Sequence, residues 1–112
     1  MSTEKNKQFA TNALHAGHDP KLTGGTRAVP IYQSTAYVFD SAEHAANLFS
    51  LAEPGNIYTR INNPTTDILE QRLAALEGGI ASVVTASGTA AIATSLLVLL
   101  KAGDHIVASN SL

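Results

Sequence analysis

The chain has 112 residues, of which 45% are apolar and 14% charged, and its formal net charge is −2. This composition is typical of a folded domain, and seven lysines and arginines without a basic cluster argue against nucleic acid as a partner. The longest apolar run, residues 96–100, is far too short to span a bilayer, and the absence of cysteine excludes disulfides and thiolate metal sites. We therefore expect a cytoplasmic protein without a membrane partner.

Residues 1–62 mix glycine, proline, threonine and asparagine with short apolar pieces, which predicts an arm rather than a layered domain. Residues 28–32 and 34–39 are expected to be extended, since Pro30 keeps the residue before it out of the helical conformation. An apolar arm without partner strands needs another surface to bury itself.

One helix is predicted within the arm, over residues 42–51. Asp40 or Ser41 can cap its first turn, and the helix is expected to stop at the Glu53-Pro54-Gly55 run. Its apolar side chains recur at helical spacing and are Ala45, Leu48 and Phe49.

A second helix is predicted over residues 64–77. Asn63 can cap it, and Pro64 occupies the first helical position, where a missing N–H costs nothing. Gly78 and Gly79 end the helix. The expected apolar stripe consists of Leu69, Leu73 and Leu76.

Residues 63–112 read as the start of a layered α/β domain. Short strands are predicted over 80–85 and 105–108, and a helix over 89–100 joins them. Strand, helix and strand in this order predict a right-handed parallel unit. The helix is apolar nearly all round, so we expect it to be buried on both sides.

The run Tyr58-Thr59-Arg60 is the first candidate for chemistry. A guanidinium presents a fixed fork of donors and a phenol a rigid hydroxyl, and both suit a phosphate. In an extended segment, side chains two residues apart project to the same side and can converge on one anion. The alternative is an exposed arginine and a half-buried tyrosine at a helix entrance.

A second candidate lies at Ser87-Gly88-Thr89, where a predicted strand passes into a helix. Free N–H groups and the positive end of the dipole attract anions there, and glycine allows close approach. The pattern matches neither a P-loop nor a Rossmann fingerprint. A hydrolase nucleophile elbow is excluded, because it would need glycine where Thr85 and Thr89 stand. The alternative is a tight turn without a ligand.

The remaining polar residues carry weaker signals. His15 and His18 flank Ala-Gly and have only Asp19 nearby as a further metal ligand, so we predict no metal site. Glu70 and Glu77 are explained by Arg72 and solvent, and no acid/base pair stands out.

Taken in order, five motifs resemble the pyridoxal-phosphate enzymes of cysteine and methionine metabolism. The resemblance covers residues 9–112, and within the family the arm looks most like the O-acetylhomoserine sulfhydrylase branch. The motifs are Tyr58-Thr59-Arg60, Asn63-Pro64-Thr65, Leu76-Glu77-Gly78, Ala86-Ser87-Gly88-Thr89-Ala90-Ala91 and Gly103-Asp104-His105-Ile106.

The resemblance implies an aspartate-aminotransferase type of fold, fold type I, with pyridoxal 5'-phosphate as the cofactor. It implies that residues 1–62 form an arm on a neighbouring subunit and that residues 63–112 begin the cofactor domain. The partners implied are further copies of the chain, as a dimer of shared-site dimers (a homotetramer), or a complementing chain.

The resemblance also implies two sets of cofactor-binding residues. Tyr58 and Arg60 would bind the cofactor phosphate of the neighbour. Ser87, Gly88 and Thr89 would bind the phosphate held by their own subunit. The family often has methionine at the position of Thr89, which a backbone donor tolerates.

The chemistry implied is γ-replacement, in which sulfide or a thiol displaces acetate from O-acetylhomoserine to give homocysteine or methionine. This needs a lysine for the imine with the cofactor, and none of the four lysines suits the role: Lys5, Lys7, Lys21 and Lys101. We therefore expect the first quarter of an enzyme, inactive alone. The alternatives are a methionine γ-lyase, a cystathionine γ-synthase or lyase, or a non-catalytic assembly module.

Overall fold

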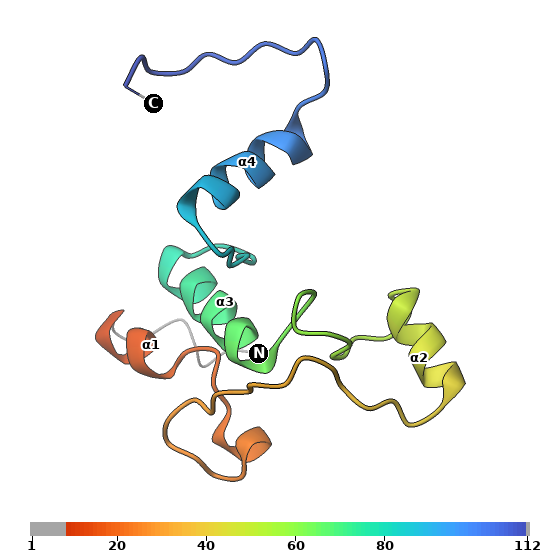
Figure 1. Ribbon diagram of the computed structural model, residues 1–112. Helices are drawn as coiled ribbons and strands as arrows, with labels where there is room; N and C mark the ends of the chain where they lie inside the picture. The colour runs from red at the N-terminus through yellow and green to blue at the C-terminus, as the bar shows by residue number, and fades with distance from the viewer. Residues whose placement is uncertain (1–8, 112) are drawn as a thin grey trace.

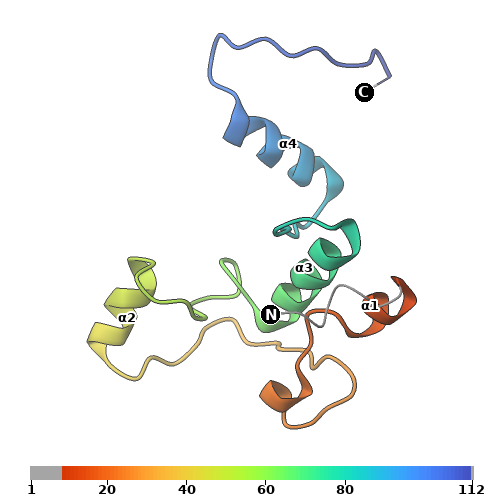
Figure 2. The same cartoon turned by 180° about the vertical axis from the view of Figure 1, so that it is seen from behind.

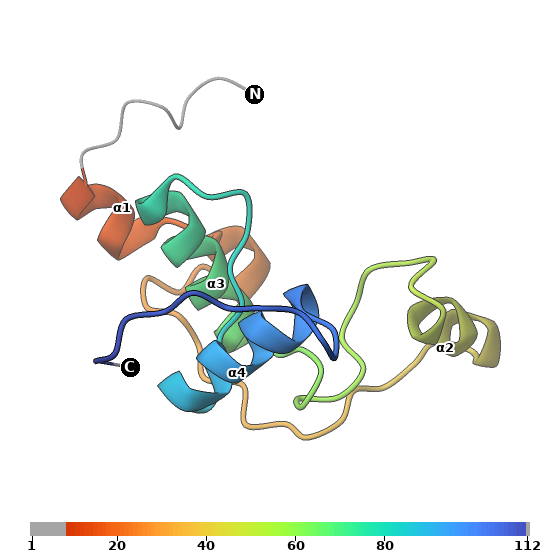
Figure 3. The ribbon, with the colours of Figure 1, turned by 90° about the horizontal axis from the view of Figure 1, so that it is seen from above.

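The computed structural model describes residues 9–111 and shows five helical elements in this part of the chain. Helix α1 lies beside α3, whereas α2 and α4 stand away from that pair (Figures 1 and 2). Seen from above, α1 and α2 lie at opposite sides of the molecule (Figure 3). The elements are α1 (Phe9–His15), the 3-10 helix η1 (Pro20–Thr23), α2 (Ala42–Phe49), α3 (Pro64–Glu77) and α4 (Gly88–Leu99).

Helix α3 begins and ends where the sequence predicts. The side chain of Asn63 accepts a hydrogen bond from the N–H of Thr65 at 2.8 Å, and Pro64 follows as the first helical residue. At the other end Gly78 is left-handed, with φ of 68°, and its N–H donates to the carbonyl of Ala74. The prediction of a capped helix over residues 64–77 is confirmed.

Helix α2 is two residues shorter than predicted. Ser41, the second of the two candidate caps, accepts from the backbone of the first turn, and the helix ends at Phe49. Leu51 has φ of 59°, which no right-handed helix allows. The buried side chain of the helix is Leu48, which packs against Gly55; a Cβ on that glycine would lie 2.7 Å from a Leu48 methyl group.

Helix α1 was not predicted, and it packs on α3 through a glycine. Gly17 follows α1 with φ of +76°, and an added Cβ would lie 2.6 Å from the carbonyl oxygen of Ile68. The Nε of Arg72 donates to the carbonyl of Ala16 at 2.9 Å. A left-handed glycine therefore lets the chain approach α3 closely, and Arg72 fastens it there.

The expected apolar stripe of α3 is not its buried face. Ile68 and Ala74 are buried, whereas Leu69 and Leu73 are 45% and 39% exposed. The prediction of a leucine stripe as the packed face is therefore wrong within the described residues. The reason is that α1 approaches α3 beside Ile68 and leaves Leu69 and Leu73 exposed, while Leu76 is half-buried.

Neither predicted strand forms in residues 9–111. Residues 80–85 and 105–108 are assigned no strand, so the expected parallel unit is absent from this part of the structure. The first segment is instead held against α3, where the N–H of Val84 donates to a Glu70 carboxylate oxygen at 2.9 Å. A strand needs a partner with free N–H and C=O groups at its edge, and the described residues supply none to these segments.

Helix α4 lies open rather than buried. Its residues Leu97, Val98 and Leu99 are 77 to 79% exposed, contrary to the expectation of cover on two sides. The whole chain exposes 9419 Å², whereas a compact protein of 11.7 kDa exposes about 5,900 Å². Much apolar surface is therefore exposed to solvent. No helix in the described part is long and apolar enough to cross a membrane.

Replacing Gly17 by Ala should loosen α1 from α3. The added Cβ meets the Ile68 carbonyl, so we expect the free energy of opening of α1, measured by amide hydrogen exchange, to fall by about 1 to 3 kcal/mol. Gly24→Ala is the matched control, because its φ is +68° and nothing lies within 4 Å of the new Cβ. Equal exchange in α1 for both variants would contradict the close approach.

Candidate functional site

The side chains of Tyr58 and Arg60 lie against each other in the loop between α2 and α3. The guanidinium carbon of Arg60 is 4.9 Å from the centroid of the Tyr58 ring, a cation–π distance. The N–H of Ile61 donates to the Tyr58 carbonyl at 2.8 Å, so the backbone turns here. The expectation of an extended segment through Arg60 is wrong; the turn brings the two groups together instead.

The donors of this pair are open. Within residues 9–111, neither the Tyr58 hydroxyl nor the Arg60 guanidinium has a hydrogen-bond partner in the protein. A guanidinium stacked on a ring keeps its N–H groups free at its edge, in the plane that suits a phosphate. We name Tyr58 with Arg60 the Tyr-Arg pair.

Residues 34–36 hold the loop that carries the Tyr-Arg pair. Tyr58 forms an antiparallel bridge with Ala36, and the N–H of Thr59 donates to the Thr35 carbonyl at 2.9 Å. The Thr59 hydroxyl donates to the carbonyl of Ser34. This bridge is the one β-type pairing in the described residues, so residues 34–36 position the loop directly.

The second predicted group lies at the start of α4. Ser87 caps the helix, and its hydroxyl oxygen accepts from the N–H of Ala90 at 3.1 Å. The N–H groups of Gly88 and Thr89 have no partner among the described residues, and an added Cβ at Gly88 would meet nothing within 4 Å. The helix start therefore offers two backbone donors, and Ser87 can still donate its hydroxyl hydrogen.

The structure does not bring these two groups together. The Tyr-Arg pair precedes α3 in the chain, whereas Ser87, Gly88 and Thr89 follow it, and α4 touches no other helix in the described residues (Figure 1). Each group presents hydrogen-bond donors and is open on one side. A complete phosphate site would need donors from a second source.

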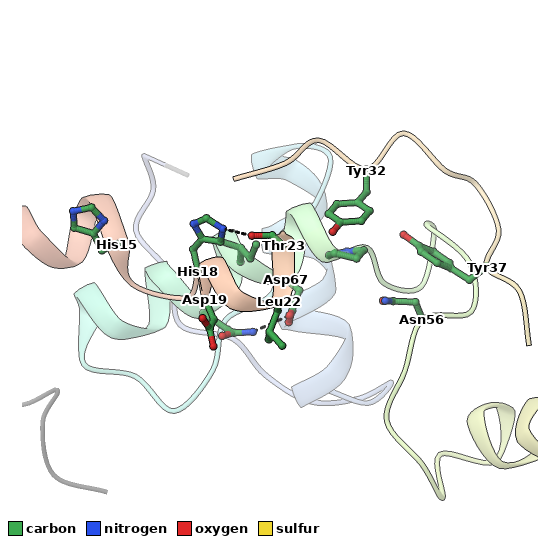
Figure 4. A pocket seen from close by; sticks show the side chains of 13 residues that line it. His15, His18, Asp19, Leu22, Thr23, Tyr32, Tyr37, Asn56 and Asp67 are labelled. Carbon is green, nitrogen blue, oxygen red and sulfur yellow. Dashed lines mark hydrogen bonds between the residues drawn. The ribbon is translucent and has the colours of Figure 1, made fainter. Parts of the chain in front are cut away.

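A hollow in the structure lies apart from both groups. It has a volume of about 660 Å³ and lies between α1, η1, α3 and the arm, with Tyr32, Tyr37 and Asn56 on one side (Figure 4). None of the five predicted site residues lines it. Asp19 and Asp67 do, and two carboxylates repel a phosphate. These two carboxylates disfavour an anion in the hollow.

His18, which lines this hollow, has a hydrogen-bonded partner within the protein. His18 shares a hydrogen bond of 2.9 Å with the Thr23 hydroxyl, and Asp19 accepts from the N–H of Lys21. In the part of the chain that the structure describes, no three metal-ligating side chains gather closely enough to hold an ion.

Sequence reasoning missed two residues that shape the candidate site. Asn62 binds the backbone of the loop, and Asn63 reaches the loop as well as capping α3. The Asn-Asn dipeptide before Pro64 is visible in the sequence. Capping of the following helix is a sufficient explanation of Asn63 when only the sequence is considered.

Two of the four lysines lie in the described residues, and neither belongs to the loop of the Tyr-Arg pair or to the start of α4. Lys21 lies in η1, and Lys101 follows α4 at the end opposite Gly88. Lys5 and Lys7 lie outside the described residues.

Comparison with known proteins gives a consistent family match. A model of the Cys/Met metabolism PLP-dependent enzymes matches residues 10–112. An O-acetyl-L-homoserine sulfhydrylase from Leptospira meyeri is 56% identical over 99% of this chain and 25% of its own length. O-acetyl-L-homoserine sulfhydrylase 1 from Thermus thermophilus is 59% identical over 94% of this chain and 25% of its own. An L-methionine gamma-lyase from Fusobacterium nucleatum is 50% identical over the whole chain and 28% of its own.

Solved structures agree with the sequence matches. A Campylobacter jejuni protein described as an O-acetylhomoserine (thiol)-lyase, with N'-pyridoxyl-lysine-5'-monophosphate, superposes with a TM-score of 0.83 and 46% identity. The superposition covers 88% of this chain and 24% of that one. The chain thus spans about a quarter of the length of the relatives it matches.

Proposed function

Because the chain belongs to the Cys/Met metabolism PLP-dependent enzyme family, we propose that it is part of an O-acetylhomoserine sulfhydrylase. The fold is that of fold type I, as predicted, and the cofactor of the family is pyridoxal 5'-phosphate. The complete enzyme would exchange the acetate of O-acetylhomoserine for sulfide or a thiol, giving homocysteine or methionine. Residues 1–62 would be its arm on a neighbouring subunit, and residues 63–112 the beginning of its cofactor domain.

One observation carries the proposal: the donors that this chain leaves open suit a phosphate. The Tyr-Arg pair supplies a guanidinium and a phenol, while α4 supplies the N–H groups of Gly88 and Thr89 and the hydroxyl of Ser87. No carboxylate hydrogen-bonds or pairs with either set in the described residues. A phosphate dianion accepts from all of these groups, and a helix start adds the favourable end of its dipole.

Each of the two sets of donors is open on one side, which supports a cofactor site shared between two subunits. Tyr58 and Arg60 would serve the phosphate of a neighbouring subunit, and Ser87, Gly88 and Thr89 that of their own. Two copies related by a twofold axis would then form two equal sites, and two such dimers a homotetramer.

The residues of this chain would bind and orient the cofactor rather than move protons. When bound, pyridoxal phosphate supplies the electron sink that γ-replacement requires. Charge-assisted hydrogen bonds from Arg60 and the helix start would fix the phosphate, and with it the position of the ring. The ring of Tyr58 holds the Arg60 guanidinium in place before the cofactor arrives.

A methionine γ-lyase is the main alternative, and a relative of that name is as similar as several sulfhydrylases. Cystathionine γ-synthase or lyase activity, or a non-catalytic assembly role, would use the same phosphate donors. The sulfhydrylase is favoured because the first relatives to match carry that name.

The activity of the complete enzyme separates these alternatives. We expect kcat/KM for sulfide-dependent homocysteine formation from O-acetylhomoserine to exceed that for thiol release from methionine. Cysteine is the control nucleophile, since cystathionine as the main product would indicate a cystathionine γ-synthase. Faster elimination from methionine than replacement would overturn the sulfhydrylase assignment.

Replacing Arg60 by Ala should weaken binding of pyridoxal phosphate in the complete enzyme. One charge-assisted hydrogen bond is lost, so we expect a loss of about 1.5 to 3 kcal/mol, measured by equilibrium dialysis. Affinity for pyridoxal, which lacks the phosphate, should not change. Arg27→Ala is the matched control, because Arg27 is an exposed arginine in a bend of the arm. Unchanged phosphate affinity in Arg60→Ala would exclude the phosphate role.

Mixed oligomers test whether the site is shared. Ser87→Asp keeps a capping oxygen but places a negative charge where the phosphate would lie. When Arg60→Ala and Ser87→Asp subunits are mixed, each mixed dimer should contain one intact site. Random mixing then restores up to about one quarter of wild-type activity. No recovery, with mixed dimers shown by mass spectrometry, would place both groups in the same subunit's site.

A further inference from the structure

Asn63 is the one polar side chain that is buried in the described residues, and it uses all of its hydrogen-bonding groups. It is 4% exposed. Its Oδ1 accepts from the N–H of Thr65 at 2.8 Å, and its Nδ2 donates to the carbonyl of Tyr32 at 2.9 Å and to the Thr59 hydroxyl at 3.1 Å. One amide thus joins α3, the arm and the loop of the Tyr-Arg pair.

Capping of α3 explains the Oδ1 acceptor of Asn63 but not its Nδ2 donors. A cap needs an acceptor, and serine or aspartate would supply one equally well. The two Nδ2 hydrogens need separate acceptors, because a buried donor without a partner is costly. Their acceptors are Tyr32 and Thr59, neither of which belongs to α3. The amide therefore has a second task in the loop.

That task concerns Thr59, which lies between the two members of the Tyr-Arg pair. Asn63 holds the Thr59 hydroxyl from the side of α3, while the arm holds Thr59 through the carbonyls of Ser34 and Thr35. Tyr58 and Arg60 flank Thr59, and their side chains make no hydrogen bonds within the described residues. The direction of these two side chains therefore depends on how Thr59 is held.

The neighbouring Asn62 closes the rest of the loop. Its Oδ1 accepts from the N–H of Ile57 at 3.3 Å, and its Nδ2 donates to the carbonyl of Gly55 at 2.6 Å. Asn62 binds only within its own loop, whereas Asn63 reaches both the arm and α3. Asn63 therefore joins the loop to both Tyr32 and the start of α3 through one side chain.

We propose that Asn63 is the positioning residue of the Tyr-Arg pair. It fixes Thr59 to α3 and to the arm, and so presents Tyr58 and Arg60 to the phosphate of the neighbouring subunit in one geometry. Donors that are already ordered lose less entropy when the anion binds. This inference rests on the proposed function of the Tyr-Arg pair.

The test separates the two tasks of Asn63 in the complete enzyme. Asn63→Ser and Asn63→Asp both keep a capping acceptor for α3. The aspartate has no donor, and the single hydroxyl hydrogen of the serine cannot serve Tyr32 and Thr59 together. Asp67→Ala is the control: it removes an exposed first-turn acid of α3 without touching the loop. Amide exchange is read at Thr59, Ile61 and Asn62, and affinities are measured for pyridoxal phosphate and for pyridoxal.

We expect both Asn63 variants to speed exchange of the loop amides roughly 5- to 10-fold, the factor for one net hydrogen bond. Affinity for pyridoxal phosphate should fall by a similar factor, and affinity for pyridoxal should stay the same. A purely structural role would lower both affinities together. Asp67→Ala should leave the loop amides and both affinities unchanged.

Two outcomes overturn the inference at different points. If Arg60→Ala loses phosphate affinity but both Asn63 variants keep wild-type exchange and affinity, Asn63 positions nothing and the proposed function stands. If Arg60→Ala keeps its phosphate affinity, the proposed phosphate role fails and the inference fails with it. Should Asn63→Asp not fold, because its carboxylate faces two oxygens, Asn63→Ser alone decides the result.

Discussion

The hydrogen bonds of Asn63 are the constraint on which the rest of this structure depends. They connect α3, the arm and the loop of the Tyr-Arg pair with a single buried amide. The apolar core cannot do this, because only Leu48, Ile57, Ile68 and Ala74 are buried apolar residues among those described. A buried amide is satisfied only when its three partners are in place, so it specifies the arrangement more sharply than apolar contacts would.

The same shortage of core explains the open form. Helix α4 is apolar nearly all round, yet its leucines face outward, and residues 80–85 have no strand beside them. Elements of this kind are stable in layers, where a parallel sheet is covered on both faces. The chain superposes on a solved relative with a TM-score of 0.83 and covers 24% of that chain's length.

The open side of each set of donors also affects how the proposed cofactor site would form. The Tyr-Arg pair and the start of α4 each present donors on one side only, and the chain does not close either set on itself. A site divided between subunits would be formed only on assembly. Cofactor binding and oligomer formation would then stabilise each other, because a ligand that contacts both subunits binds only the assembled state.

The sequence by itself determined the local features. Asn63 before Pro64 and Gly78 after Glu77 mark the ends of α3 through caps that act within one turn, and Ser87 before Gly88 marks the start of α4 in the same way. The ordered motifs pointed to the family and its cofactor, which the family match confirms.

Only the tertiary structure decided which faces and side chains meet across the chain. The buried face of α3 contains Ile68 rather than the leucine stripe, because Gly17 brings α1 to that side. The Tyr-Arg pair converges in a turn rather than an extended segment. Asn63 reaches Tyr32, 31 positions away, and no local pattern encodes such a contact. Caps depend on neighbours in sequence, whereas packing and long-range hydrogen bonds depend on neighbours in space.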